Sequence, residues 1–240
     1  MLSCAGLRNA EVASAFFARL LVNAPRIALI HAVTVAIAPV SEALAALWPE
    51  ARVQNLLDDA LSRDREADGA LTEAMHERIV SLARYVHGCG AQGILYTCSA
   101  FGAAIDAAKR AVPVPVLKPN EAMFEAALAG GRRFGMLATF PPSVASMEEE
   151  FNDLVAARGV DASLTTVCVP EAMQALRAGR GDDHDRLLAQ AAPSLRDCDA
   201  LLLAHFSTSR AYEAVSAAVR MPVLTSPRSA VLALRGSMQR

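Results

Sequence analysis

Short apolar runs alternate with longer stretches of helical periodicity along most of the chain. Such runs are typical of buried strands, and amphipathic stretches of this length are typical of the helices that connect them. The pattern predicts strands at 26–31, 52–57, 93–97, 114–117, 133–139, 164–169, 200–204 and 222–225. It predicts helices at 40–48, 71–86, 104–111, 122–128, 144–157, 184–195 and 209–219. Strands that alternate with helices form parallel sheets covered on both faces, so we predict an α/β fold.

The second half of the chain repeats the first at one constant offset in the numbering. Three pairs of segments superpose: 27–33 (IALIHAV) on 134–140 (FGMLATF), 93–100 (GILYTCSA) on 200–207 (ALLLAHFS), and 115–119 (PVLKP) on 222–226 (PVLTS). Three matches in register indicate a duplicated four-strand unit. We therefore predict two pseudo-symmetric Rossmann-like half-domains, each with a four-stranded parallel sheet flanked by helices. The active site is expected in the cleft between them, since parallel sheets bind ligands beyond the carboxyl ends of their strands.

These segments also divide the chain. Residues 1–24 form an N-terminal leader, residues 25–120 the first α/β half-domain and residues 121–225 the second, while residues 226–240 are able to pack on the first. The leader lacks a cationic segment before an apolar stretch, and Arg8, Glu11 and Arg19 interrupt its hydrophobic run. We interpret it as a helical or partly disordered leader rather than a signal peptide.

Composition and charge narrow the classes of function. Of the 240 residues, 53% are hydrophobic and 20% are charged, and the apolar content is mainly Ala, Leu and Val, as in helices packed on a parallel sheet. The formal net charge is −2 and no Lys/Arg cluster follows a helical face, which argues against a nucleic-acid partner and favours a small molecule. No stretch long enough to span a bilayer is free of charges, so no membrane partner is predicted.

Cysteine spacing and missing motifs exclude several kinds of site. The chain has five cysteines, an odd number: Cys4, Cys89, Cys98, Cys168 and Cys198. No two of them have a C-x-x-C spacing, which argues against a disulfide framework or a structural zinc site and fits a reducing cytoplasm. The chain also lacks the motifs of phosphate-binding loops, zincins, serine hydrolases and dinucleotide-binding turns. We therefore expect neither a metal nor a cofactor.

Cys98 is the leading candidate for chemistry. It lies in YTCSAFG, between the end of a predicted strand and the start of a predicted helix. Backbone N–H groups and the helix dipole at that place are expected to lower the pKa of the thiol toward neutrality, which would favour a thiolate able to act as base or nucleophile. The alternative is a small buried hydrophobic residue. Cys89 and Cys168 are interpreted in that second way.

His205 occupies the equivalent position in the second half, at the end of the apolar run LLLAHFSTS. Burial there is expected to lower the pKa of the imidazole and keep it neutral, as a competent base; the alternative is a hydrogen-bonded core histidine. His31 ends the first strand and can also point into the cleft. His76, His87 and His184 lie in polar contexts and are predicted to be solvated.

Hydroxyl groups and backbone amides at helix starts favour binding of a carboxylate. The candidates are Ser99 and Ala100 in the first half and Ser207 and Thr208 in the second. Thr139 and Ser143 follow the fifth predicted strand in LATFPPSV and are candidates of the same kind. Ordinary helix capping explains the same pattern, and the two roles are compatible. Lys118 follows a strand and is a candidate cation at the edge of the cleft.

The pattern resembles the aspartate/glutamate/hydantoin racemase superfamily, with its maleate isomerase and arylmalonate decarboxylase relatives. The matching stretches are RIALIHAV, GILYTCSAFGAAIDAAKR, RRFGMLATFPPSVASMEEEF, CDALLLAHFSTS and MPVLTSPRSAV, which together extend over nearly all of the chain after the leader. The resemblance implies two facing α/β half-domains and catalysis without PLP, metal or nucleotide. It also implies a pair of cysteines that flank the substrate, one removing an α-proton while the other supplies one. Cys98 matches the first cysteine, whereas His205 stands where the family usually has the second.

Three functions follow from this resemblance. The first is a racemase or isomerase of a small carboxylate or amino-acid-like substrate, with Cys98 as the proton-transferring thiolate and His205 as its partner. The second is a decarboxylase or cis–trans isomerase of the same fold that acts on a malonate-like or maleate-like dicarboxylate. The third is a non-catalytic small-molecule-binding protein, in which the Cys98 thiol would react no faster than a free thiol. A homodimer is an option, since enzymes of this size and type are often dimers.

Overall fold

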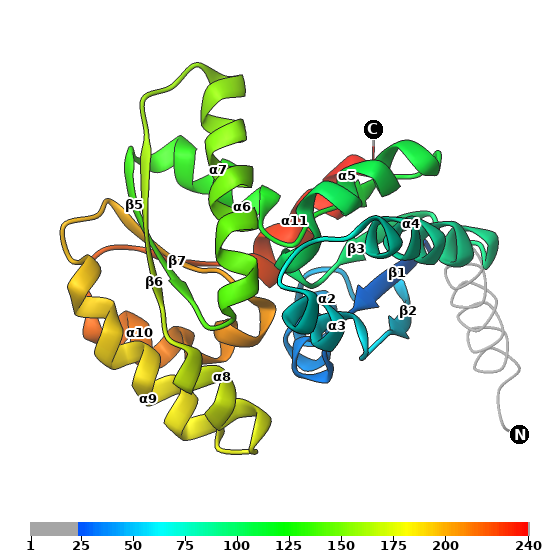
Figure 1. Ribbon diagram of the computed structural model, residues 1–240. Coiled ribbons are helices and arrows are strands. Elements are labelled where there is room, and N and C mark those ends of the chain that lie inside the picture. Colours follow the sequence, from blue (N-terminus) through cyan, green and yellow to red (C-terminus); the bar gives the residue numbers. More distant parts are fainter. Residues whose placement is uncertain (1–23, 240) are drawn as a thin grey trace, which may run out of the picture.

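Two four-stranded parallel sheets form the framework of the computed structural model, which describes residues 24–239. The order is β2-β1-β3-β4 in the first sheet and β6-β5-β7-β8 in the second, so the two halves have the same topology (Figure 1). The strands of the first sheet are β1 (Arg26–His31), β2 (Arg52–Leu57), β3 (Gly93–Tyr96) and β4 (Val116–Leu117). Those of the second are β5 (Arg133–Ala138), β6 (Ser163–Cys168), β7 (Ala200–Leu203) and β8 (Val223–Thr225). The predicted fold class is confirmed.

Strand register shows how closely the halves correspond. Ile27 pairs with Gly93 in the first sheet, and Phe134 pairs with Ala200 in the second. Phe134 and Ala200 are thus the residues that the repeat in the sequence matches to Ile27 and Gly93. The β2 and β6 strands differ, because Arg26 pairs with Arg52 whereas Arg133 pairs with Ser163. Four extra residues therefore precede β6 in the second half, and the segments that follow β2 and β6 correspond at this larger offset.

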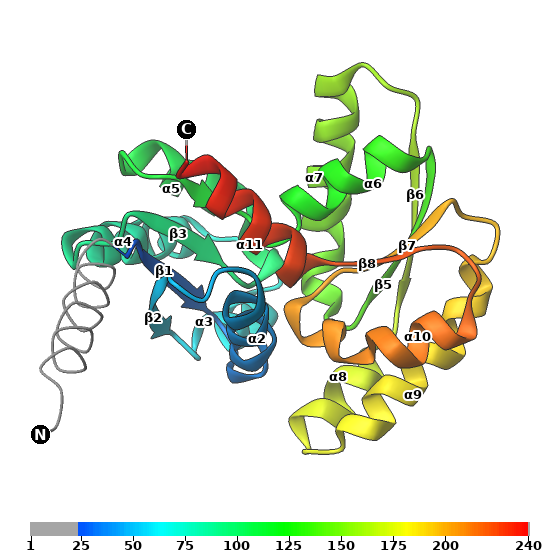
Figure 2. The same ribbon diagram turned by 180° about the vertical axis from the view of Figure 1, so that it is seen from behind.

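Helices cover both faces of each sheet, as expected for parallel strands that form near-continuous apolar runs. In the first half α4 and α5 pack on one face and α2 and α11 on the other (Figures 1 and 2). In the second half α6 and α7 pack on one face and α9 and α10 on the other. The helices are α2 (Ile37–Leu47), α3 (Leu61–Asp68), α4 (Glu73–Gly88), α5 (Gly102–Ala111), α6 (Glu121–Gly130), α7 (Val144–Arg158), α8 (Pro170–Arg177), α9 (Gly181–Ala191), α10 (Tyr212–Ala218) and α11 (Ser226–Ser237).

Four short 3₁₀ segments of the described chain lie between a strand and the helix that follows it: η1 (Thr34–Ala36), η2 (Ser99–Phe101), η3 (Pro141–Ser143) and η5 (Phe206–Ala211). A fifth, η4 (Ala192–Leu195), extends the end of α9. The predicted helices at 184–195 and 209–219 were therefore too long, since each is partly 3₁₀. The predicted strands at 93–97, 133–139 and 200–204 each end one residue earlier, and 114–117 is strand only over its last two residues.

Three helices were not predicted, namely α3, α8 and α11. Only Leu61 and Ser62 of α3 are buried, so its sequence has no apolar stripe that could indicate a helix. In contrast, α11 buries Ala230, Val231 and Leu234 in the core of the first sheet. The predicted leader lies outside the described residues except for residue 24.

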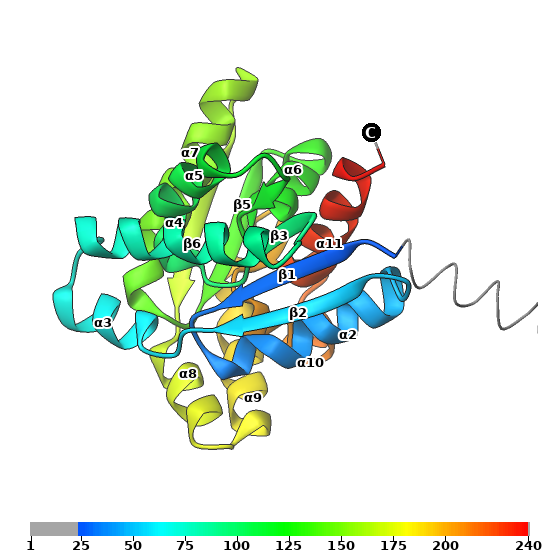
Figure 3. The same ribbon diagram turned by 90° about the vertical axis from the view of Figure 1, so that its right-hand side faces the viewer.

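The chain passes between the halves twice, after β4 and after β8, and the two crossings are hydrogen-bonded to each other. Ser226 at the start of α11 donates to the side-chain oxygen of Asn120, which lies just before α6. The Asn120 amide in turn donates to Ser99 Oγ at 3.0 Å. All three side chains are buried. Figure 3 views the molecule from the side of the first half, with β1 and β2 in front of β5 and β6. Over residues 24–239, no helix is long and apolar enough to cross a membrane.

Candidate active site between the half-domains

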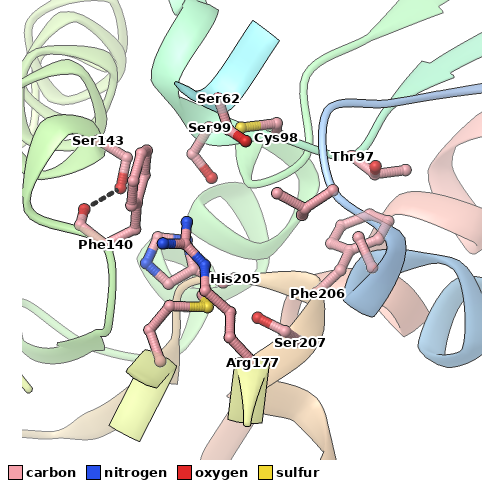
Figure 4. A pocket seen from close by; sticks show the side chains of 13 residues that line it. Ser62, Thr97, Cys98, Ser99, Phe140, Ser143, Arg177, His205, Phe206 and Ser207 are labelled. Carbon is pink, nitrogen blue, oxygen red and sulfur yellow. Dashed lines mark hydrogen bonds between the residues drawn. The ribbon is translucent and has the colours of Figure 1, made fainter. Parts of the chain in front are cut away.

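The segments that follow β1, β3, β5 and β7 meet around one pocket, together with residues of α3 and α8 (Figure 4). The pocket contains about 400 Å³ of empty space. Its wall combines apolar side chains with hydroxyl groups, one thiol, one imidazole and one guanidinium: Val33, Ala36, Ser62, Thr97, Cys98, Ser99, Phe140, Ser143, Met173, Arg177, His205, Phe206 and Ser207. A partly apolar pocket with a few convergent polar groups is typical of a small-molecule site.

Most of this wall is built from equivalent positions of the two halves. At the offset of the repeat, Val33 corresponds to Phe140 and Cys98 corresponds to His205. The larger offset that applies after β2 and β6 relates Ser62 of α3 to Met173 of α8. The pocket therefore has a pseudo-symmetric plan with different residues on its two sides.

Cys98 follows β3 and is the N-cap residue of η2. Burial raises the pKa of its thiol to about 11, and the opposing effects of the Ala100 N–H and the positive charge of Arg65 are smaller. The prediction of a lowered pKa was therefore wrong. The α-helix that was expected to begin next to Cys98 begins only at Gly102, after the 3₁₀ segment η2. With a pKa of about 11, the side chain of Cys98 is a thiol at neutral pH.

His205 follows β7 and is the N-cap residue of η5. Its side chain is buried, and desolvation, with a smaller effect from His184, lowers the pKa to about 4. The predicted neutral imidazole is thereby confirmed. Its backbone is held by Thr208, whose Oγ1 accepts from the His205 N–H at 3.2 Å and donates to the His205 carbonyl at 2.6 Å. The imidazole Nε2 is buried without a hydrogen-bond partner, and Figure 4 shows the ring at the pocket.

Three of the predicted hydroxyl residues line the pocket: Ser99, Ser143 and Ser207. Ser99 Oγ accepts the hydrogen bond from Asn120, whereas Ser143 Oγ donates to the Phe140 carbonyl at 2.8 Å. Ser143 is the N-cap residue of α7 but makes no side-chain capping hydrogen bond, so the capping role predicted for it was wrong.

Four predicted site residues do not line the pocket: His31, Ala100, Thr139 and Thr208. His31 is fully buried behind it, with Nδ1 2.9 Å from Thr97 Oγ1 and Nε2 2.9 Å from Asn55 Oδ1. It supports the pocket residue Thr97 rather than facing the pocket itself. Thr208 is engaged by the backbone of His205, and Thr139 Oγ1 is buried without a partner.

Two further predictions from polar context were wrong. His184 is fully buried rather than solvated, because its Nδ1 is 2.7 Å from Asp185 Oδ1 and that carboxylate is held by Arg210 at 2.9 Å. Lys118 is not at the pocket, since its ammonium group pairs with Asp106 at 2.7 Å. The four described cysteines are free thiols. Within residues 24–239 no group of three His, Cys, Asp or Glu side chains is arranged to hold a metal ion.

Arg177 is the most informative lining residue that sequence reasoning missed. It lies on α8 with its guanidinium carbon 5.8 Å from the centre of the Phe140 ring. Its Nη1 is 3.8 Å from the carboxylate of Glu66 on α3, and these two residues are equivalent at the larger offset. Ser62 and Met173 were missed for the same reason, because the offset between the halves is four residues larger after β2 and β6. A comparison of the two halves that allowed four inserted residues between β5 and β6 would have found both pairs.

Comparison with known proteins agrees with this architecture. Residues 32–161, more than half of the chain, match the family model Asp/Glu/Hydantoin racemase. No curated protein sequence matches the chain significantly. The structure of glutamate racemase from Thermus thermophilus in complex with β-chloro-D-alanine superposes with a TM-score of 0.70 at 21% identity, over 90% of this chain and 80% of that one.

Two other solved structures share the fold. Glutamate racemase isoform RacE1 from Bacillus anthracis gives a TM-score of 0.68 at 16% identity, over 90% of this chain and 82% of that one. A liganded mutant of arylmalonate decarboxylase gives 0.63 at 17% identity, over 89% and 92% of the two chains. With a family match over more than half its length and the same two-sheet fold, the chain belongs to the Asp/Glu/hydantoin racemase family.

Proposed function

We propose that this protein is a cofactor-independent racemase or isomerase that moves a proton at the carbon next to a carboxylate. The observation that carries the proposal is the placement of Cys98 and His205 at equivalent strand ends on one pocket. A group on each side of a bound carbon is what two-sided proton transfer requires.

The protonation states of the two groups define the first step. His205 is neutral and Cys98 is a thiol, so His205 accepts the α-proton while the Cys98 S–H donates to the opposite face of the carbanion. The products are an imidazolium and a thiolate, which are the starting forms for the other enantiomer. Ser99 and Ser207 have hydroxyl groups at the pocket that suit a carboxylate, and Arg177, although its charge is paired with Glu66, adds guanidinium N–H donors.

The test is proton exchange in D₂O, followed by NMR for a panel of amino acids, hydantoins, maleate and malonates. Wild-type protein should exchange the α-hydrogen of its substrate, and Cys98→Ala should lose exchange and turnover. Cys168→Ala is the matched control, since Cys168 is a half-buried thiol on β6 that is not part of the pocket wall. Full exchange and turnover in Cys98→Ala would refute the proposal.

A decarboxylase acting on a malonate-like dicarboxylate is the second candidate, and one observation favours it. With pKa values of about 11 for Cys98 and about 4 for His205, forming thiolate and imidazolium costs on the order of 10 kcal/mol before their attraction is counted. Decarboxylation avoids this state. The carboxylate leaves as CO₂, its bonding electrons remain on carbon, and the Cys98 thiol supplies the proton. Release of CO₂ from a malonate, without α-hydrogen exchange of amino acids, would select this reaction.

A further inference from the structure

Arg65 lies on α3 and contacts both the segment that follows β3 and the segment that follows β5. Its Nε donates to the Ala100 carbonyl at 3.4 Å, and its Nη2 donates to the Pro142 carbonyl at 3.4 Å. The first carbonyl belongs to the first half and the second to the other half, so one guanidinium spans the boundary between them. The remaining nitrogen, Nη1, is buried and has no hydrogen-bond partner among residues 24–239.

The same guanidinium acts on the thiol of Cys98. Arg65 binds the carbonyl of Ala100, and the backbone N–H of the same residue is one of the groups that favour the thiolate of Cys98. Both that N–H and the charge of Arg65 lower the pKa of the thiol, against the larger effect of burial. Arg65 does not line the pocket, so it acts on the sulfur rather than on a ligand.

Other charged groups around the pocket are compensated or neutral. Arg177 is paired with Glu66, and burial keeps His205 uncharged. Asp64, next to Arg65 in the chain, is paired at 2.7 Å with another arginine. Arg65 itself makes no ion pair within residues 24–239. Its charge is therefore left to act on the neighbouring thiol.

We propose that Arg65 is a positioning residue that stabilises the thiolate of Cys98. It holds the segment around Ala100 in place, and its positive charge has no ion-pair partner within residues 24–239. The inference rests on the proposed role of Cys98 in proton transfer. When the S–H bond breaks, the proton passes to the substrate carbanion and the sulfur keeps the electron pair. The positive charge stabilises that anion in a site that is poor in water.

The test measures thiol ionisation directly, without substrate. In protein whose other four cysteines are replaced by serine, the ¹³Cβ chemical shift of Cys98 is followed from pH 8 to pH 11. Arg65→Gln keeps an amide donor but removes the charge, and should raise the pKa by about one pH unit. At pH 10.5 the ionised fraction then falls from about a quarter to about 3%, an eightfold loss, given a starting pKa of about 11. Arg65→Lys retains the charge and should lie close to wild type.

The matched control is Arg63→Gln, since Arg63 is on the same helix with its side chain 70% exposed. It should leave the titration unchanged. Equal ionisation in wild type and Arg65→Gln would overturn the proposal, and so would an equal shift in Arg63→Gln. If Arg65→Gln does not fold, Arg65→Met, which removes both the charge and the donors, should raise the pKa of the thiol at least as much. Because no substrate is present, lack of turnover in wild type would refute the proposed function and leave this result intact.

Discussion

Glu150 is a buried carboxyl group on α7 whose replacement by glutamine tests the electrostatics of the boundary between the halves. Its Oε1 has no hydrogen-bond partner. Burial, the largest effect, raises its pKa from 4.5 to about 7; Lys118 and Lys109 lower it, while Glu121 and Asp106 raise it. A carboxyl group in this state is neutral in the folded protein at mildly acidic pH and must ionise in a dry site as the pH rises.

The raised pKa can be converted into stability. The folded state binds the proton more tightly than the unfolded state, so this contribution is fully present below pH 4.5 and is lost as the pH rises through 7. The loss amounts to about 3 kcal/mol at pH 8 and to less than about 1 kcal/mol at pH 5. Glu150→Gln does not titrate. Its free energy of unfolding, relative to wild type, should therefore increase by about 2.5 kcal/mol from pH 5 to pH 8.

The assay is urea unfolding followed by circular dichroism at several pH values in this range. A gain of about 2.5 kcal/mol corresponds to a shift of roughly 1 M in the urea midpoint, for the slope expected of a domain of this size. Glu149→Gln is the control, because Glu149 is exposed and adjacent in the chain, and it should show no such pH dependence. If the curves of Glu150→Gln and wild type run parallel from pH 5 to pH 8, the reasoning is refuted.

Three further predictions concern the site and its support. Burial lowers the pKa of His205 from 6.5 to about 4, so its contribution to stability is present above pH 6.5 and is lost as the pH falls toward 4. Between pH 7.5 and pH 4.5 the free energy of unfolding in urea should therefore fall by about 2.5 kcal/mol more for wild type than for His205→Asn, and equal losses would contradict this. Asn120→Ala leaves the buried hydroxyl of Ser99 unpaired, whereas Ser226 keeps the Leu203 carbonyl as an acceptor, and it should cost about 2 kcal/mol in thermal unfolding together with a loss of substrate affinity. An unchanged KM would show that Ser99 does not need this partner. Gly135→Ala would place a Cβ 2.8 Å from Leu195 Cβ and should destabilise the protein by about 1–3 kcal/mol, so an unchanged melting temperature would contradict the packing.

The strands and the duplication could be predicted because they depend on local and repeated patterns. The apolar runs at 27–30 and 201–203 are fully or almost fully buried, and that pattern is visible in the sequence alone. Helices α3 and α8 could not be predicted in the same way. Both are short, α3 has almost no apolar face, and the four-residue change in offset before them hides their equivalence.

The positions of the two candidate acid–base groups could be predicted, but the electrostatics of the thiol could not. Cys98 and His205 meet because equivalent strands end at the same edge of two equivalent sheets. The pKa of the thiol depends on how much water reaches it, which follows from packing between segments far apart in the chain. His184 shows the same limit, because its acidic sequence context gave no sign of burial beside Arg210.

The pseudo-symmetric pocket has a kinetic consequence. A bound carbon would meet Cys98 and Ser99 on one side but His205 and Phe206 on the other, so its two faces lie in unlike surroundings. The equilibrium constant between enantiomers is nonetheless one, which requires equal kcat/KM in the two directions. For a racemase, the difference between the walls can therefore change kcat between the two directions only if KM changes by the same factor. A decarboxylation has no such constraint, and the same asymmetry would then lead to a single product enantiomer.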